Sequence, residues 1–261
     1  MVPRFRRQVS AVSKVLILLL VTILTTAAHA AIEHNTVLLS TDVEMDLRYF
    51  PAEGDTMLLG FPCDQGMGLA EEAAGEVLAG RGIEVWLADL LGAHFLPIAP
   101  SSMRGLKGGE VARLVEHAVE KSGKHIALTA SGYGAIPALR GARIWQKQHP
   151  EDRHLLGAIL FFPMLSAHNP EPGKPLEYLD IVHQTNLPIV IMQPSNSPNR
   201  FWARTMQKAL QESGSRVHIE ILHGVRSRFY ARNDATPEEK AMTERLPDLI
   251  ERALSILRSQ E

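Results

Sequence analysis

The chain has 261 residues, of which 45% are hydrophobic and 21% charged, and this is enough for one large domain with a substantial core. The formal net charge is −2 at pH 7, and no lysine- or arginine-rich run occurs, which argues against nucleic acid or an anionic membrane as a partner. The single cysteine, Cys63, cannot form a disulfide within the chain. Eleven histidines are scattered singly, so we expect no metal site and no cofactor.

Residues 1–30 are predicted to be an export signal. Four basic residues precede an apolar run at 15–24, and an Ala-His-Ala cleavage site follows at 28–30. The apolar run is too short to span a bilayer, so we expect an exported chain, periplasmic or secreted, with no stable membrane span after cleavage. Cleavage leaves 23 basic residues (27 less 4) against 29 acidic ones. The mature protein is therefore expected to be mildly acidic.

Residues 31–261 are predicted to form a single α/β domain, because short β-rich runs alternate with amphipathic helical patterns. Such alternation is typical of a mostly parallel sheet with helices on both faces. The expected strands are 36–40, 45–50, 56–61, 83–89, 126–130, 156–162, 188–192 and 217–222. The expected helices are 69–81, 109–121, 133–148, 200–213 and 237–259. The proline-rich residues 164–180 are either a cap over the domain or an ordinary surface excursion.

The most informative segment of the chain is the decapeptide at 126–135, Ile-Ala-Leu-Thr-Ala-Ser-Gly-Tyr-Gly-Ala. A strand that enters a helix through a turn of small residues is typical of a nucleophile elbow, which needs small residues two before and two after its tip. Ala130 and Gly134 meet this frame and place Gly132 at the tip. Centring the frame on Ser131 would instead put Tyr133 in a small position, where its ring would crowd the helix against the strand.

This segment, the order of the elements and two later turns resemble the α/β-hydrolase superfamily, at its dienelactone hydrolase-like end. The resemblance covers most of residues 35–258 and implies the α/β-hydrolase fold, with a mostly parallel central sheet and helices on both faces. In this superfamily a nucleophile, an acid and a histidine converge at the carboxyl ends of the strands. Gly132 stands where the resemblance implies a nucleophile, and glycine has no oxygen to attack a carbonyl group.

The resemblance also implies an acid in the turn after the strand at 188–192. That turn, Gln-Pro-Ser-Asn-Ser-Pro, contains no carboxylate, and Asn196 or Ser197 stands at the expected position. A histidine is implied after the last strand, before a Phe-Tyr pair, where Ser227 stands. Asparagine cannot stabilise an imidazolium as a carboxylate does, and serine cannot take up a proton near neutral pH. All three catalytic positions are thus predicted to be degenerate.

Two backbone N–H groups that the resemblance implies for the oxyanion hole, those of Phe61 and Tyr133, are candidates for binding an anion or a carbonyl oxygen. The glycine and proline beside Phe61 could instead only shape a tight turn. Arg226 and Arg228 flank the altered histidine position. They are candidates for binding an anionic ligand, although solvated loop charges are the simpler interpretation.

Two functional hypotheses remain. In the first, the chain is a non-catalytic exported protein that binds a small molecule or an envelope protein, or that has a structural role. In the second, it is a divergent exported serine esterase or peptidase that uses Ser131 with His223, and with Asp180 or Asp234 as the acid. The absence of a serine, a histidine and an acid from the three expected positions favours the first.

Overall fold

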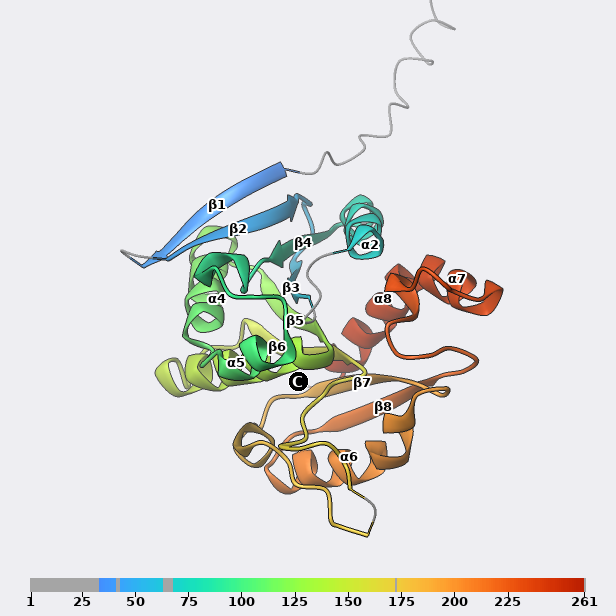
Figure 1. Ribbon diagram of the computed structural model, residues 1–261. Helices are drawn as coiled ribbons and strands as arrows, with labels where there is room; N and C mark the ends of the chain where they lie inside the picture. Colours follow the sequence, from blue (N-terminus) through green and yellow to red (C-terminus); the bar gives the residue numbers. More distant parts are fainter. Residues whose placement is uncertain (1–32, 41–42, 63–67, 172, 261) are drawn as a thin grey trace, which may run out of the picture.

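The computed structural model describes residues 33–40, 43–62, 68–171 and 173–260, so the predicted signal peptide and Cys63 lie outside the described residues. The described chain forms an eight-stranded sheet flanked by helices (Figure 1). The strands are β1 (Glu33–Ser40), β2 (Val43–Phe50), β3 (Thr56–Phe61), β4 (Ile83–Ala88), β5 (His125–Ser131), β6 (Leu155–Phe161), β7 (Ile189–Pro194) and β8 (Val217–Leu222). The α-helices are α2 (Leu69–Gly80), α3 (Pro100–Gly105), α4 (Gly109–Ser122), α5 (Ala135–Gln148), α6 (Ala203–Glu212), α7 (Pro237–Glu244) and α8 (Leu246–Arg258).

The strand order is β1-β2-β4-β3-β5-β6-β7-β8. Strand β2 is antiparallel to both of its neighbours, and every other pairing is parallel. The prediction of a mostly parallel sheet is therefore confirmed. Phe61 pairs with Ala130 between β3 and β5, and Ser131 pairs with Phe161 between β5 and β6. The carboxyl ends of these three strands consequently meet at one edge of the sheet.

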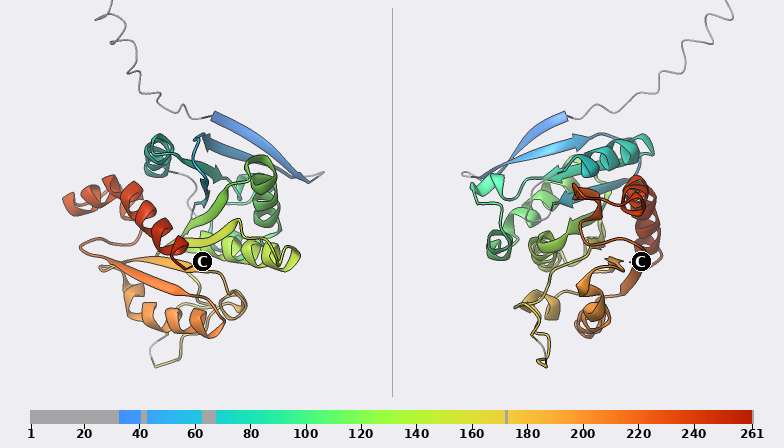
Figure 2. Two further views of the ribbon diagram at one scale, coloured as in Figure 1. Left: turned by 180° about the vertical axis from the view of Figure 1, so that it is seen from behind. Right: turned by 45° about the vertical axis from the view of Figure 1, so that its right-hand side comes forward.

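Helices cover both faces of the sheet, as predicted (Figure 2). Helices α4, α5 and α6 share one hydrophobic cluster with the sheet, and α2 and α8 share the other. Neighbouring residues of a strand point to opposite faces, so Leu58 belongs to the cluster with α8 and Leu59 to the cluster with α5. Burial on both faces explains why the central strands are continuous apolar runs. In the part of the chain that is described, no helix combines the length and the apolar character needed to cross a membrane.

The prediction of one closing helix over 237–259 is wrong, because α7 and α8 are separate helices that meet at Arg245. Pro247 lies in the first turn of α8. A proline inside a continuous helix would remove a backbone hydrogen bond and clash with the carbonyl group four residues earlier. Helix α7 begins with a capping box between Thr236 and Glu239. The break lets α8 pack across the sheet while α7 lies beside the loop that follows β8.

The segment between β6 and the 3₁₀ turn at Asp180–His183 contains the candidate cap, and it is described apart from residue 172. It is irregular, with one isolated antiparallel bridge between Ser166 and Tyr178. Its first part is fastened to the elbow, because the Met164 N–H donates to the carbonyl oxygen of Gly132 at 2.9 Å. This attachment places the segment beside the turn after β5.

Candidate functional site at the end of strand β5

The tip of the turn between β5 and α5 is occupied by Gly132. Ser131 ends the strand in an extended conformation, with φ −128° and ψ 148°, whereas Gly132 has a φ of +52°. Glycine adopts this left-handed region without a steric penalty, while residues with a side chain are strained there. The chain therefore reverses at Gly132, and a 3₁₀ turn at Gly132–Gly134 leads into α5.

The small residues beside the tip let α5 begin close to the loop after β3. Ala130 is buried and faces Phe61 across the β3–β5 pairing. A methyl group added at Gly134 would lie 2.6 Å from the carbonyl oxygen of Pro62 and 2.8 Å from that of Phe61. These are backbone atoms, which cannot rotate away as a flexible side chain can. The close approach therefore requires a glycine at position 134.

Replacement of this glycine is expected to be costly. Gly134→Ala should lower the free energy of unfolding by about 1–3 kcal/mol, the usual cost of overpacking a rigid site. The matched control is Gly80→Ala in α2, where an added methyl group meets no atom within 4 Å. That change should be neutral or stabilise by about 0.5–1 kcal/mol. Urea unfolding of both variants measures the difference, and equal effects would show that the approach at Gly134 is not tight.

Ser131 presents its side chain to a cavity. Only 5% of the residue is exposed, and it lines a cavity of about 60 Å³ together with Thr129, which lies two residues earlier on the same face of β5. Among the described residues, no hydrogen bond joins the Ser131 hydroxyl to another side chain. His223 lies exposed in the turn after β8. No hydrogen bond joins it to Ser131.

The two candidate acids for Ser131 are also engaged elsewhere or exposed. Asp234 accepts hydrogen bonds from Arg232 and Arg226, which lower the pKa of its carboxyl to about 2. Asp180 is an exposed residue that begins a 3₁₀ turn. In the part of the chain that is described, neither carboxylate is hydrogen-bonded to His223.

The structure does bring together the loops after β7 and β8. The Ser227 hydroxyl donates to Ser197 Oγ at 2.7 Å, and Ser197 is only 3% exposed. Asn196 points its side chain to solvent, while its N–H donates to the carbonyl oxygen of Val225 at 3.0 Å. Of the two residues considered for the acid position, Ser197 is thus the one that contacts Ser227. The contact joins two hydroxyl groups, neither of which is ionised near neutral pH.

The two candidate oxyanion residues lie on different elements, Phe61 at the end of β3 and Tyr133 in the turn that leads into α5. Phe61 is buried and lines the cavity beside Ser131. The half-buried ring of Tyr133 lies under the Arg104 guanidinium, whose carbon is 5.1 Å from the ring centroid. Arg104 also donates to the carbonyl oxygen of Ala167 at 3.1 Å. It therefore links the elbow to the segment after β6, a role that no sequence signal indicates.

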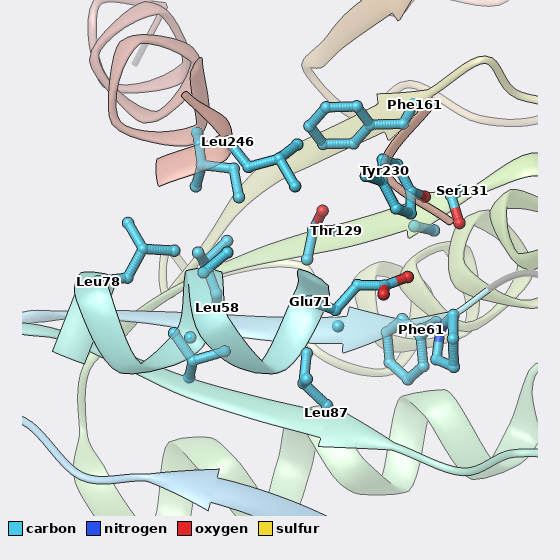
Figure 3. Close-up of a pocket in the computed structure, with 17 residues that line it drawn as sticks. Leu58, Phe61, Glu71, Leu78, Leu87, Thr129, Ser131, Phe161, Tyr230 and Leu246 are labelled. Atoms are coloured by element: carbon cyan, nitrogen blue, oxygen red, sulfur yellow. The ribbon is translucent and has the colours of Figure 1, made fainter. Parts of the chain in front are cut away.

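The cavity beside the elbow lies between the sheet and the helices α2 and α8 (Figure 3). Most of its lining is apolar, and it comes from the strands β3 to β6 and from both helices. The lining residues are Leu58, Gly60, Phe61, Pro62, Glu71, Ala74, Gly75, Leu78, Val85, Leu87, Thr129, Ala130, Ser131, Phe161, Tyr230, Leu246 and Ile250. A concave apolar site with a few convergent polar groups is the usual form of a small-molecule site.

Glu71 is the only carboxylate among the described residues that line this cavity. Burial raises the pKa of its carboxyl group, while the nearby backbone N–H groups of Glu71 and Gly68 and the charge of Arg48 act to lower it. Its Oε2 atom is buried and has no hydrogen-bond partner. The sequence reasoning missed Glu71, because it is one of two adjacent glutamates at a helix start and only the fold shows which of them is enclosed. Its neighbour Glu72 forms an ion pair with Arg48.

The loop that follows β8 is held by an ion-pair network centred on Arg226. Its guanidinium donates to both carboxylate oxygens of Glu239, at 2.7 and 2.6 Å, and to Asp234 at 3.0 Å. The Glu239 side chain is fully buried, and its carboxylate also accepts the N–H of Thr236 in the capping box. Arg226 is therefore ion-paired, although its side chain remains 34% exposed, and it is not a free loop charge. The residue fastens the loop that carries Ser227 to α7.

No protein-family model matches the chain, and comparison with curated proteins gives no match. Solved structures do match. An esterase of Pyrobaculum calidifontis is 17% identical with a TM-score of 0.59, covering 95% of this chain and 94% of its own. The apo form of Thermogutta terrifontis esterase 2 is 18% identical with a TM-score of 0.55, covering 85% and 95%. A Klebsiella pneumoniae protein described as a dienelactone hydrolase is 14% identical with a TM-score of 0.57, covering 82% and 96%.

At these identities the likeness establishes the fold and not the activity. Strand β2 is antiparallel to its neighbours, and the strands from β4 to β8 in the sheet run parallel to one another. This arrangement agrees with the architecture predicted from the sequence. The turn between β5 and α5 lies at the carboxyl edge of this sheet, beside the cavity. The chain therefore has the α/β-hydrolase fold, as do the esterases and the hydrolase that it resembles in structure.

Proposed function

We propose that this protein is a non-catalytic, exported α/β-hydrolase-fold protein that uses the cleft beside the elbow to bind a small molecule or an envelope protein. The observation that carries the proposal is the position of Gly132, whose φ of +52° places a residue without a side chain at the point where the chain reverses. A nucleophile held at that point would require a side-chain oxygen, sulfur or nitrogen atom. Glycine supplies none of them.

The contact between Ser197 and Ser227 supports the same conclusion. In a hydrolase triad, an acid orients a histidine, and the histidine accepts the proton of the nucleophile. Two hydroxyl groups 2.7 Å apart keep the geometry of such a contact but cannot accept a proton near neutral pH. The proposed loss of catalysis thus involves three positions that would have to act together. Export rests on the basic and apolar pattern of residues 1–30 alone.

A second candidate function is a divergent esterase with Ser131 as its nucleophile. It is favoured by one observation, namely that Ser131 lines the cavity without a hydrogen bond to another described side chain. Its weakness is that His223 lies exposed in the turn after β8. Without a base, the hydroxyl of serine is a weak nucleophile at neutral pH.

Ester turnover separates the two functions. The mature protein is expected to hydrolyse p-nitrophenyl acetate and p-nitrophenyl butyrate no faster than a denatured sample of the same protein does. Turnover above that rate that disappears in Ser131→Ala and in His223→Ala, while Ser195→Ala retains it, would establish the esterase instead. Ser195 is a suitable control because its hydroxyl lies outside the cavity, where it accepts the Gly224 N–H.

A further inference from the structure

The cavity beside the elbow has a polar end and an apolar end. Figure 3 shows the Glu71 carboxylate and the Ser131 hydroxyl toward one end, with Leu58, Leu78 and Leu246 toward the other. The hydroxyl of Thr129 lies between them and belongs to the same lining. A site of this kind matches a small molecule with one polar head and one apolar tail.

The polar end is rich in hydrogen-bond acceptors. Glu71 Oε2 is buried without a hydrogen-bond partner, and the hydroxyls of Ser131, Thr129 and Tyr230, which line the same cavity, can each accept or donate a hydrogen bond. No lysine, arginine or histidine is among the described residues that line the cavity. A buried acceptor without a donor costs free energy, and the cost is larger when the group is charged. The complementary ligand head therefore carries several N–H donors and a positive charge.

We propose that this cavity binds a short primary alkylammonium ion. This assignment rests on the proposed function, since it names the ligand class of the same cleft. The ammonium group donates to Glu71 Oε2 and to the hydroxyls of Ser131 and Thr129, and the alkyl chain extends toward Leu78 and Leu246. The cavity volume of about 60 Å³ favours a short chain of a few carbon atoms. A carboxylate head would meet Glu71 with like charge, and an alcohol would supply a single donor.

The assignment is tested by calorimetric titration of the mature protein with n-butylammonium chloride, with n-butanol and sodium butyrate as probes of equal chain length. The unaltered protein is expected to bind n-butylammonium at least about 10-fold more tightly than either of the other two, because hydrogen bonds to a charged group contribute about 1.5–3 kcal/mol. Equal or tighter binding of the alcohol or the carboxylate would overturn the assignment. So would the absence of heat with n-butylammonium.

Two matched variants locate the site. Glu71→Gln should weaken n-butylammonium binding about 10- to 100-fold, whereas Glu76→Gln should change it less than about 2-fold. Glu76 lies on the same helix and carries the same charge, but it is exposed and outside the cavity lining. Ser131→Ala, which removes one acceptor, should weaken binding about 5-fold. Unchanged binding in Glu71→Gln would overturn the assignment.

Folding of Glu71→Gln is checked by its melting temperature. The pKa of Glu71 is raised by burial, so its charge opposes folding at neutral pH, and the glutamine variant should melt no lower than the unaltered protein. Failure of the ammonium assignment is also distinguishable from failure of the proposed function. If only the ammonium assignment fails, the protein is inert toward esters but does not select n-butylammonium. If the proposed function fails, the protein shows ester turnover that depends on Ser131, whatever the cavity binds.

Discussion

The triple variant Gly132→Ser, Ser197→Asp, Ser227→His is expected to hydrolyse p-nitrophenyl acetate, which the unaltered protein should not. The first change places a hydroxyl at the tip of the elbow. The other two place an acid and an imidazole at positions whose side-chain oxygens already lie 2.7 Å apart. Positioned general base catalysis contributes about 10²- to 10⁴-fold, so a rate of about 100-fold over that of a denatured sample is expected.

The tip change carries a conformational cost. A serine at a φ of +52° is strained by about 1–3 kcal/mol, so the variant should melt at a lower temperature while it retains its circular dichroism spectrum. The double variant Ser197→Asp, Ser227→His is the matched control, because it has the acid and base without the tip hydroxyl. Activity of the double variant equal to that of the triple variant would contradict the assignment of the tip to Gly132.

The second large effect concerns the ion pair that holds the loop after β8. Glu239→Gln is expected to lower the free energy of unfolding by about 2 kcal/mol, because it removes a buried charged partner of two Arg226 hydrogen bonds. Glu238→Gln is the matched control, since Glu238 lies in the same first turn of α7 but is exposed. Urea unfolding at pH 7 gives both values. Equal stability of the two variants would show that the network does not hold the loop.

The same ion pair predicts a pH dependence. The hydrogen bonds from Arg226 lower the pKa of Glu239 to about 2, below its value of about 4.3 in an unfolded chain. A carboxyl group whose pKa is depressed by folding stabilises the protein above its unfolded pKa and loses this contribution as the pH falls. The stability difference between the unaltered protein and Glu239→Gln should therefore be constant above about pH 5 and shrink from there toward pH 2.

The sheet could be predicted because its signals are local. The strand at 56–61 is found where its apolar run placed it, and the edge strand at 217–222 is found where apolar and polar residues alternate. The closing helix was predicted wrongly although its break is also local, since Pro247 cannot lie inside a continuous helix. The reversal at Gly132 follows from small residues next to one another in the sequence, which makes the elbow accessible to the same kind of reasoning.

The contacts of the site depend on side chains that meet across loops. Ser197 and Ser227 are 30 residues apart, and no pattern in either loop indicates that their hydroxyls touch. The Arg226–Glu239 pair joins a loop to a helix in the same way. Glu71 illustrates a different limit, because its enclosure depends on the packing of α2 against the sheet and α8. Helical periodicity alone does not separate it from its neighbour.

The central claim is that the elbow holds no reactive nucleophile, and intact-mass spectrometry after exposure to an excess of a fluorophosphonate tests it most directly. This reagent phosphonylates an activated serine, and the triple variant with a restored hydroxyl provides the positive control. The account predicts that the mature, unaltered protein keeps its mass. An added phosphonyl group that is absent from Ser131→Ala would contradict it.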